Sequence, residues 1–206
     1  MKIHDISMTI EANMPVYKNL AHKVPIIENV DNYSNASHYE TLVTLNLHTG
    51  THVDFPLHMI ENGKNSNSEV IENYIGDATV FDLTHLNDHI GLDDVKSLNI
   101  KQNDFVLFKT KNSFDDVFNF DFIYLDKYAA KYLSELKIKG VGIDTLGIER
   151  AQSGHETHKY LLSEDIVILE GIRLKDIEPK SYVLIALPIK IADVEASFCR
   201  AVLIEK

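Results

Sequence analysis

The chain has 206 residues, of which 45% are hydrophobic and 25% charged, values that suit one soluble globular domain and leave little room for two. Its formal net charge of −11 argues against a surface that follows nucleic-acid phosphates, because such a surface would be repelled. The longest apolar runs are far shorter than the roughly 20 residues of a membrane span, and the N-terminus lacks the layout of a signal peptide. We therefore expect a cytosolic protein that binds a small molecule and neither nucleic acid nor membrane.

The predicted elements begin with a strand over residues 41–48, where Val43, Leu45 and Leu47 alternate with more polar residues and are expected to face the core. Runs rich in β-branched and aromatic residues predict further strands at 78–83, 105–110, 141–144, 166–170, 182–188 and 198–204. An apolar stripe predicts a helix over 126–136, with shorter helices at 92–98 and near 68–74. Because strands outnumber helices, the pattern indicates a single α/β domain over residues 1–206, built on mixed sheets.

The only cysteine, Cys199, excludes an internal disulfide and any zinc site made of several thiolates. It lies in the apolar stretch Phe198-Cys-Arg-Ala-Val-Leu-Ile. We expect it to be a small buried hydrophobic residue and not a catalytic thiol.

One short segment gathers the residues that carry chemistry: His48-Thr-Gly-Thr-His52-Val-Asp54-Phe-Pro-Leu-His58. In a straight strand, residues four apart lie about 13 Å from each other, which is too far for one shared ion. Gly50, Pro56 and the β-branched residues between them argue against a helix. We therefore expect the chain to bend at Gly50 as it leaves the strand. The alternative is a strand end and loop that are merely polar.

Imidazole and carboxylate ligands without thiolate favour Zn2+, with Mn2+, Fe2+ or Co2+ as alternatives. Two histidines and one aspartate leave coordination positions open, as a hydrolytic site requires. An aspartate can bridge to a second ion, for which His158 and Glu170 are the best remaining donors. Glu170 ends an apolar strand, where burial would be costly for an unpaired carboxylate, although exposure at the strand end explains it equally well.

The segment resembles the hallmark His-x-Gly-Thr-His-x-Asp-x-Pro-x-His of the cyclase family of metal-dependent hydrolases, which includes kynurenine formamidase and isatin hydrolase. The resemblance extends through Gly142-Ile-Asp-Thr, from His158 to Glu170, and into Leu184-Ile-Ala-Leu-Pro and Arg200-Ala-Val-Leu. It implies a swivelling β/β/α fold and a homodimer or homotetramer whose neighbouring subunits help to close the pocket.

The resemblance also implies roles for individual residues. His48, His52 and Asp54 would hold the first ion, and Asp54 would bridge to a second ion held by His158, with Glu170 contributing. The implied cofactor is zinc, two ions per subunit, with manganese as the alternative. His58 would be the acid/base residue. His155 competes with His158 for the second site, but only His158 has the family's spacing to Glu170.

The chain departs from kynurenine formamidases in its early segment. Their Pro-Val-Trp-Pro-Gly is replaced by Pro-Val-Tyr17-Lys-Asn, and the chain has no tryptophan. Tyr17 either stacks on a substrate ring or is an ordinary core or loop aromatic. The departure weakens the expectation of N-formylkynurenine as substrate without weakening the expectation of a hydrolase.

The sequence therefore predicts an amidohydrolase that cleaves an arylformamide or cyclic amide with metal-activated water and His58 as general acid/base. One alternative is a cyclase or lyase that uses the same metal on a non-amide carbonyl. Another is a non-catalytic metal-binding or ligand-binding protein, although His58, which lies outside the ligand set, counts against it. No Gly-x-Ser-x-Gly segment is present to indicate a serine hydrolase.

Overall fold

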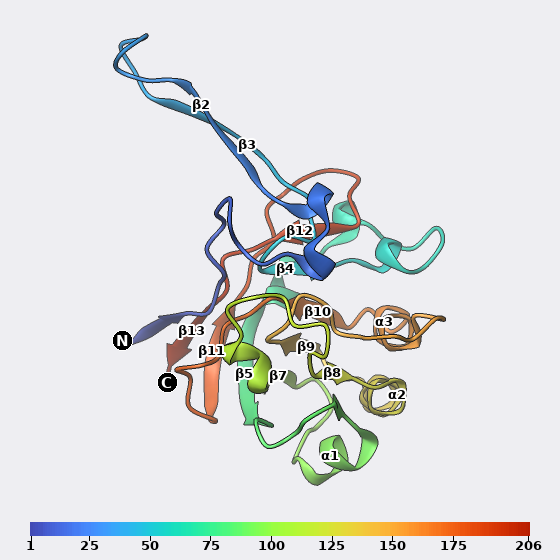
Figure 1. Cartoon of the computed structure of the whole chain (residues 1–206). Helices are drawn as coiled ribbons and strands as arrows, with labels where there is room; N and C mark the ends of the chain where they lie inside the picture. Colours follow the sequence, from blue (N-terminus) through green and yellow to red (C-terminus); the bar gives the residue numbers. More distant parts are fainter.

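The computed structural model describes residues 1–206 and is built around one nine-stranded sheet (Figure 1). The order in the sheet is β1-β13-β11-β5-β7-β9-β10-β4-β12. Strands β5, β7, β9 and β10 are parallel to one another, whereas the pairs on both sides of them are antiparallel. The prediction of an α/β fold with a mixed sheet is therefore confirmed. The bounds are β1 (Ile3–Asp5), β4 (His52–Asp54), β5 (Ile75–Asp82), β7 (Phe105–Lys109), β9 (Gly140–Ile143), β10 (Val167–Glu170), β11 (Ser181–Ile185), β12 (Ala196–Phe198) and β13 (Val202–Glu205).

Three helices, α1 (Leu92–Ser97), α2 (Lys127–Leu136) and α3 (Glu156–Leu162), lie together on one side of the sheet (Figure 1). Helix α2 begins where the Asp126 side chain accepts a hydrogen bond of 2.7 Å from the Ala129 amide, the usual way to cap a first turn. Apolar residues of α2 and α3 form one hydrophobic core with the sheet residues that face them. A second core lies on the other face and includes residues of β5, β7, β10, β11 and β13. No helix combines the length and the apolar character that crossing a membrane requires.

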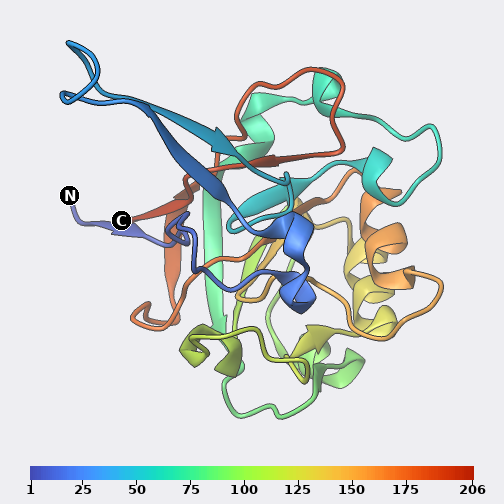
Figure 2. The same ribbon diagram turned by 45° about the horizontal axis from the view of Figure 1, so that its top comes forward.

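Two smaller strand pairs complete the fold. Strands β6 (His89–Ile90) and β8 (Tyr124–Leu125) are parallel, and β2 (Ile26–Asp31) and β3 (Glu40–Thr44) form an antiparallel hairpin. We call residues 26–44 the arm, because both views show this hairpin projecting from the body (Figures 1 and 2).

The predicted strand over 41–48 is partly wrong. It ends at Thr44, and all residues of β3 are exposed, so it has no core-facing side. The alternation of apolar residues is real, but the sole partner of β3 is β2, and this two-stranded arm stands clear of both cores.

Two other predicted elements are divided in the structure. The strand expected over 198–204 is two strands, because β12 pairs with β4 while β13 crosses to pair with β1 and β11. The helix expected near 68–74 is a pair of 3-10 turns, Ser66–Ser68 and Ile71–Tyr74. Cys199 is buried as predicted, and burial raises the pKa of its thiol to about 12.

Candidate metal centre

The hallmark segment makes a tight turn and then a short strand. Gly50 lies in the left-handed region with a φ of 70°, so the predicted bend at this glycine is confirmed. Beyond the bend the chain does not remain a loop, because residues 52–54 form β4 between β10 and β12. The antiparallel register sets Glu170 directly opposite His52, and side chains paired in this way share one face with Cβ atoms about 5 Å apart.

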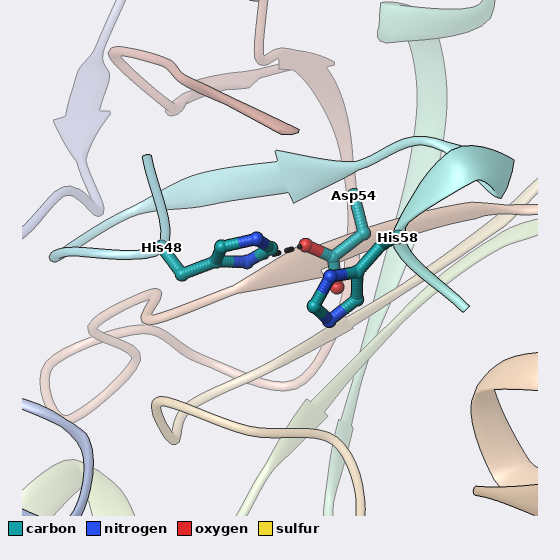
Figure 3. A group of neighbouring side chains, drawn as sticks. All are labelled: His48, Asp54 and His58. Carbon is teal, nitrogen blue, oxygen red and sulfur yellow. Dashed lines mark ion pairs between the residues drawn. The ribbon is translucent and has the colours of Figure 1, made fainter. Parts of the chain in front are cut away.

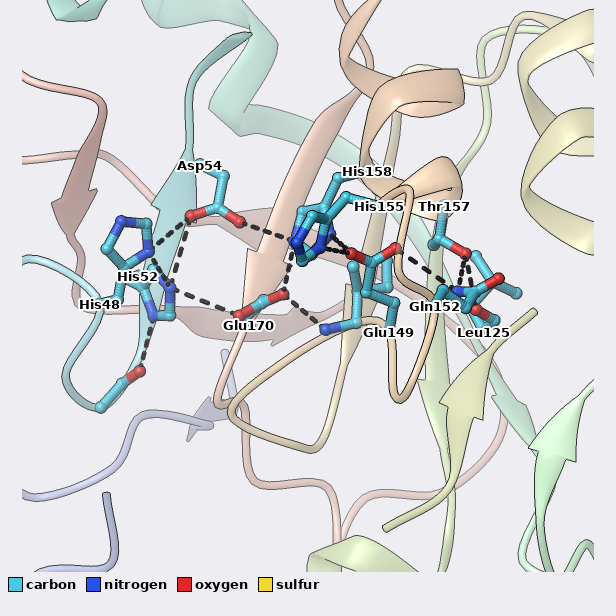
Figure 4. A network of polar contacts seen from close by, with 12 residues as sticks. His48, His52, Asp54, Leu125, Glu149, Gln152, His155, Thr157, His158 and Glu170 are labelled. Carbon is cyan, nitrogen blue, oxygen red and sulfur yellow. Dashed lines mark hydrogen bonds and ion pairs between the residues drawn. The ribbon is translucent and has the colours of Figure 1, made fainter. Parts of the chain in front are cut away.

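The first group of donors meets at one oxygen of Asp54. His48 Nδ1 lies 3.0 Å and His52 Nε2 3.5 Å from Asp54 Oδ1, and the two ring nitrogens are 3.2 Å apart (Figure 4). The Nδ1 of His52 donates to the Gly50 carbonyl at 2.9 Å. This bond directs the other ring nitrogen, Nε2, toward Asp54 and leaves it able to bind a cation.

The second group meets at the other oxygen of Asp54. His158, on α3, places Nε2 3.6 Å from Asp54 Oδ2 and 3.5 Å from Glu170 Oε1. Glu170 in turn reaches across to His52, with 3.5 Å between Oε2 and Nε2. Asp54 and Glu170 therefore lie between the two groups and each offers one oxygen to either side, as a bridging carboxylate would (Figure 4).

Asp54 is only 3% exposed, yet neither of its oxygens accepts a hydrogen bond. Burial acts to raise the pKa of this carboxyl, but the neighbouring imidazoles of His158, His48 and His52 hold it well below its usual range. Burial acts to lower the pKa of His158, and the carboxylates around it raise that pKa well above the usual value.

A buried carboxylate without donors is costly unless a positive charge compensates it. Imidazole and carboxylate donors that converge without thiolate fit a divalent cation, and the side chains around Asp54 include two three-residue groups compact enough to hold one.

His58 closes the 3-10 turn Pro56–His58 and lies beside the first group of donors (Figure 3). Its ring centroid is 4.1 Å from that of His48 and 5.5 Å from that of His158. Burial, with the nearby His48 and His158, lowers the pKa of His58 to about 4 despite the opposing charge of Asp54. The ring is therefore neutral near pH 7. His48, Asp54 and His58 are also close enough together to bind an ion jointly.

These side chains open into a cavity of about 450 Å³, a size that suits a small organic ligand. Tyr17 lines it, and its ring makes edge contacts with Phe118 and Phe122 at centroid distances of 5.4 and 6.4 Å. Tyr17 is thus packed on an aromatic cluster and also borders the cavity, and its contact with a substrate ring stays a prediction.

Comparison with known proteins places this geometry in a family. Residues 4–150 match the Cyclase family. The chain belongs to the cyclase family. Kynurenine formamidase of Erythrobacter litoralis (strain HTCC2594) is 34% identical over 165 residues, 79% of this chain and 76% of its own length. That of Bacillus cereus (strain ATCC 10987 / NRS 248) is 31% identical over 78% of each chain.

Solved structures agree with this assignment. A structure described as a potential metal-dependent hydrolase with cyclase activity is 45% identical, covers 98% of this chain and 96% of its own, and superimposes with a TM-score of 0.92. A structure described as that of a predicted metal-dependent hydrolase from Bacillus stearothermophilus is 46% identical, covers 98% of this chain and 97% of its own, and superimposes with a TM-score of 0.90. Isatin hydrolase A of Ralstonia solanacearum, 19% identical over 100% of this chain and 92% of its own, shares the fold with a TM-score of 0.86.

This cyclase-family chain brings together all the residues singled out in the hallmark, and it also uses one that sequence reasoning missed. Glu149 is buried, and its Oε1 lies 3.0 Å from the Nδ1 of His158. His155 also contacts Glu149 but is half exposed and does not reach Asp54, so the structure places His158, and not His155, at the centre. Glu149 follows β9 in a loop without any recognisable spacing, so no sequence signal marked it.

Proposed function

We propose that this cyclase-family protein is a metal-dependent amidohydrolase that cleaves an arylformamide or a related aryl amide. The observation that carries the proposal is the Asp54 carboxylate, which is buried without a hydrogen-bond donor between two sets of imidazoles. Kynurenine formamidases among its relatives support the reaction class.

In this proposal His48, His52 and Asp54 would hold one ion, and His158, with Asp54 and Glu170, would hold a second. The donor chemistry favours zinc, with manganese as the alternative. A cation bound there supplies a water of lowered pKa and polarises the amide carbonyl.

The chain's own residues perform the remaining steps. The cavity orients the aryl amide with its carbonyl toward Asp54, and the packed aromatic rings beside Tyr17 exclude bulk water from one wall. His58 borders the cavity next to His48. From this position its ring takes up a proton as water attacks the carbonyl carbon and returns the proton to the leaving nitrogen.

The test separates metal binding from proton transfer. We expect Asp54→Asn to lose both the metal and formanilide hydrolysis, because the shared ligand is gone. His58→Gln should keep its metal and lose turnover by about 10²- to 10⁴-fold, whereas the exposed control His85→Gln should match the wild type. An unchanged rate in His58→Gln would refute its role, and metal-free active protein would refute the whole proposal.

A lyase or cyclase reaction at the same centre is the rival activity, and one solved relative is described as a potential metal-dependent hydrolase with cyclase activity. Hydrolysis must place a solvent oxygen in the product acid. Turnover in ¹⁸O-labelled water followed by mass spectrometry of the product distinguishes the two, because product without the label would indicate the rival reaction.

We further propose that the protein is a homo-oligomer. The arm exposes large apolar side chains on both of its strands, including Ile27 at 45% and Val43 at 46% exposed. Its second strand leads into His48, so a subunit that packed against the arm would lie near the mouth of the cavity.

A further inference from the structure

A second cavity, of about 560 Å³, lies apart from the metal centre and shares no lining residue with the first. It is enclosed between two segments that lie side by side, residues 66–74 and the stretch that leads from β11 to β12 (Figure 2). The buried residues of its lining are Phe55, which follows Asp54 in the chain, and Tyr74. A space of this size suits a small organic ligand.

Hydrogen bonds hold the two segments together at two places. At one of them the Ser66 amide donates to the Val194 carbonyl at 3.0 Å, and the Val194 amide donates to the Ser66 hydroxyl at 3.2 Å. At the other, the Ala186 amide donates to the Tyr74 carbonyl at 3.0 Å. The chain itself therefore fixes the spacing of the walls, and the cavity does not need a ligand in order to form.

Most of the side chains around this second cavity are apolar, and a single carboxyl lies among them. Ile71, Ile189 and Ile191 contribute aliphatic surface, and Glu69 is the only acidic residue of the lining. The Tyr74 hydroxyl donates a hydrogen bond to Oε2 of Glu69. The other oxygen, Oε1, is left for a ligand.

No cation of the chain compensates the Glu69 carboxylate. Glu69 is half-buried and forms no ion pair, and the nearby Lys64 is paired with Asp165 instead. Burial and the Asp165 charge raise the pKa of Glu69 to about 7, against the attraction of Lys64. Lys190 also lines the cavity but is exposed, so its stem borders the wall while its ammonium stays in water. A carboxylate partly removed from water is stabilised by a positive charge placed against it.

We propose that this second cavity binds a small organic amine, with the ammonium group on Glu69 and the apolar part against Ile71, Ile189 and Ile191. The ammonium donates a charge-assisted hydrogen bond to Oε1 of Glu69, and the aliphatic wall shields the apolar part from water. Binding there needs neither the metal nor an amide substrate, so the site is independent of the proposed hydrolysis.

The alternative occupant is a second copy of the chain. Ile71 is 58% and Ile189 54% exposed, so an apolar contact between subunits would cover the mouth of the cavity. Such a contact would leave the Glu69 carboxyl without a compensating charge, whereas an ammonium supplies one. The alternative predicts that the assembled protein takes up no amine at this place.

Calorimetry at pH 8 on the metal-loaded protein would compare cyclohexylmethylamine with cyclohexylmethanol, a neutral molecule of nearly the same size. We expect the wild type to prefer the amine and Glu69→Gln to bind the amine about tenfold or more weakly, with the alcohol unaffected, because only the charged contact is lost. The new amide oxygen still accepts the hydrogen bond from the Tyr74 hydroxyl. Glu72→Gln is the matched control, since it removes an exposed carboxylate from the 3-10 turn Ile71–Tyr74 without altering the lining.

A second variant tests the apolar part of the site. Ile189→Ser removes an exposed aliphatic side chain and should weaken both probes about threefold, because each loses the same apolar contact. Unchanged affinity for both probes in this variant would place them elsewhere and refute the site. Equal affinity for amine and alcohol in the wild type, an amine preference that survives in Glu69→Gln, or no binding to the wild type would refute it as well.

Discussion

Two buried aspartates, Asp54 and Asp144, differ in the hydrogen bonds that their carboxylates accept. Asp144 accepts hydrogen bonds from the amide and hydroxyl of Thr110, both at 2.7 Å, and from the Ser113 hydroxyl at 2.6 Å. Asp54 is almost as deeply buried and has no such donor. Satisfied carboxylates stabilise a loop, whereas an unsatisfied one needs a cation. The contrast supports the proposal that Asp54 is a metal ligand, whereas Asp144 has the contacts of a structural residue.

The same reasoning predicts the effect of Glu149→Gln. The Oε1 of Glu149 lies 3.0 Å from the Nδ1 of His158, and this contact directs the Nε2 of His158 toward Asp54. Loss of a carboxylate behind a histidine ligand commonly costs 10- to 100-fold in metal affinity. Competition with a chromophoric chelator should show a drop of that size. The control Glu156→Gln removes a partly exposed carboxylate from α3, the helix that carries His158, and an equal drop in both variants would contradict the role of Glu149.

The raised pKa of Glu69 predicts how the free energy of unfolding depends on pH. Burial and the Asp165 charge raise the pKa of its carboxyl to about 7, against the attraction of Lys64, from an ordinary value of 4.5. Between these values the folded state binds a proton that the unfolded state does not. The free energy of unfolding therefore falls as pH rises through this window, and the loss is complete above about pH 7.

Replacing the carboxyl by an amide should remove this dependence. Glu69→Gln should match the wild type at pH 5 and exceed it at pH 8 by about 1–2 kcal/mol, once solvent screening of this partly exposed group is counted. The amide oxygen can still accept the hydrogen bond from the Tyr74 hydroxyl. Urea unfolding at the two pH values measures the difference, and an identical slope with pH in both proteins would contradict the prediction.

At the level of residues, the sequence predicted the site residues that lie close together along the chain. His48, His52 and Asp54 stand out because one turn and one short strand contain them all. Glu149 could not be predicted, because its place beside the Nδ1 of His158 depends on how the loop after β9 folds back against α3.

Among the elements, the contact between the turn before β4 and the turn after β10 determines the geometry of the metal centre. We call this contact the joint. Gly171 follows Glu170 with a φ of 68°, and a Cβ built on it would lie 2.4 Å from the Gly50 carbonyl oxygen. The Thr51 hydroxyl donates to the Gly171 carbonyl at 2.7 Å and ties the two turns together. The two glycines allow the turns that carry His48 and Glu170 to approach this closely.

Gly171→Ala should therefore separate the two halves of the centre. The new methyl group meets backbone that cannot rotate away, and the left-handed φ adds about 1 kcal/mol. We expect a loss of stability of about 2–4 kcal/mol and at least tenfold weaker metal binding. Gly91→Ala is the control, because its Cβ would make only ordinary contacts starting at 3.4 Å. Metal binding unchanged in Gly171→Ala would show that the joint does not set the geometry.

The accuracy of the element predictions follows from burial. The strands at 105–110, 141–144 and 166–170 were predicted well, because central strands are continuous apolar runs. The stretch 198–204 is apolar except for Arg200, but nothing in its composition shows that the chain changes partners within it. Alternation over 41–48 predicted a strand but not its location, since a strand that faces a core and one in an exposed hairpin can have the same pattern.

For the molecule as a whole, the arm is the part whose apolar side chains find no partner within the single chain. A two-stranded hairpin is marginally stable by itself in water, and this one is exposed on both faces along β2 and β3. Ile27 and Val43 are directly paired across it. Apolar surface of this kind on a projecting element is characteristic of a protein interface. Contact with a second copy would bury it.

We therefore expect the wild-type protein to be a dimer or tetramer at micromolar concentration, as measured by analytical ultracentrifugation. The double variant Ile27→Ser with Val43→Ser should shift it toward monomer, because the change replaces paired apolar side chains at the contact. Val117→Ser, at a position 73% exposed outside the arm, is the control and should leave the association unchanged. If neighbouring subunits close the cavity, the monomeric variant will also show a raised KM while it retains its metal. A monomeric wild type, or a double variant that associates like the wild type, would show that the arm has some other partner.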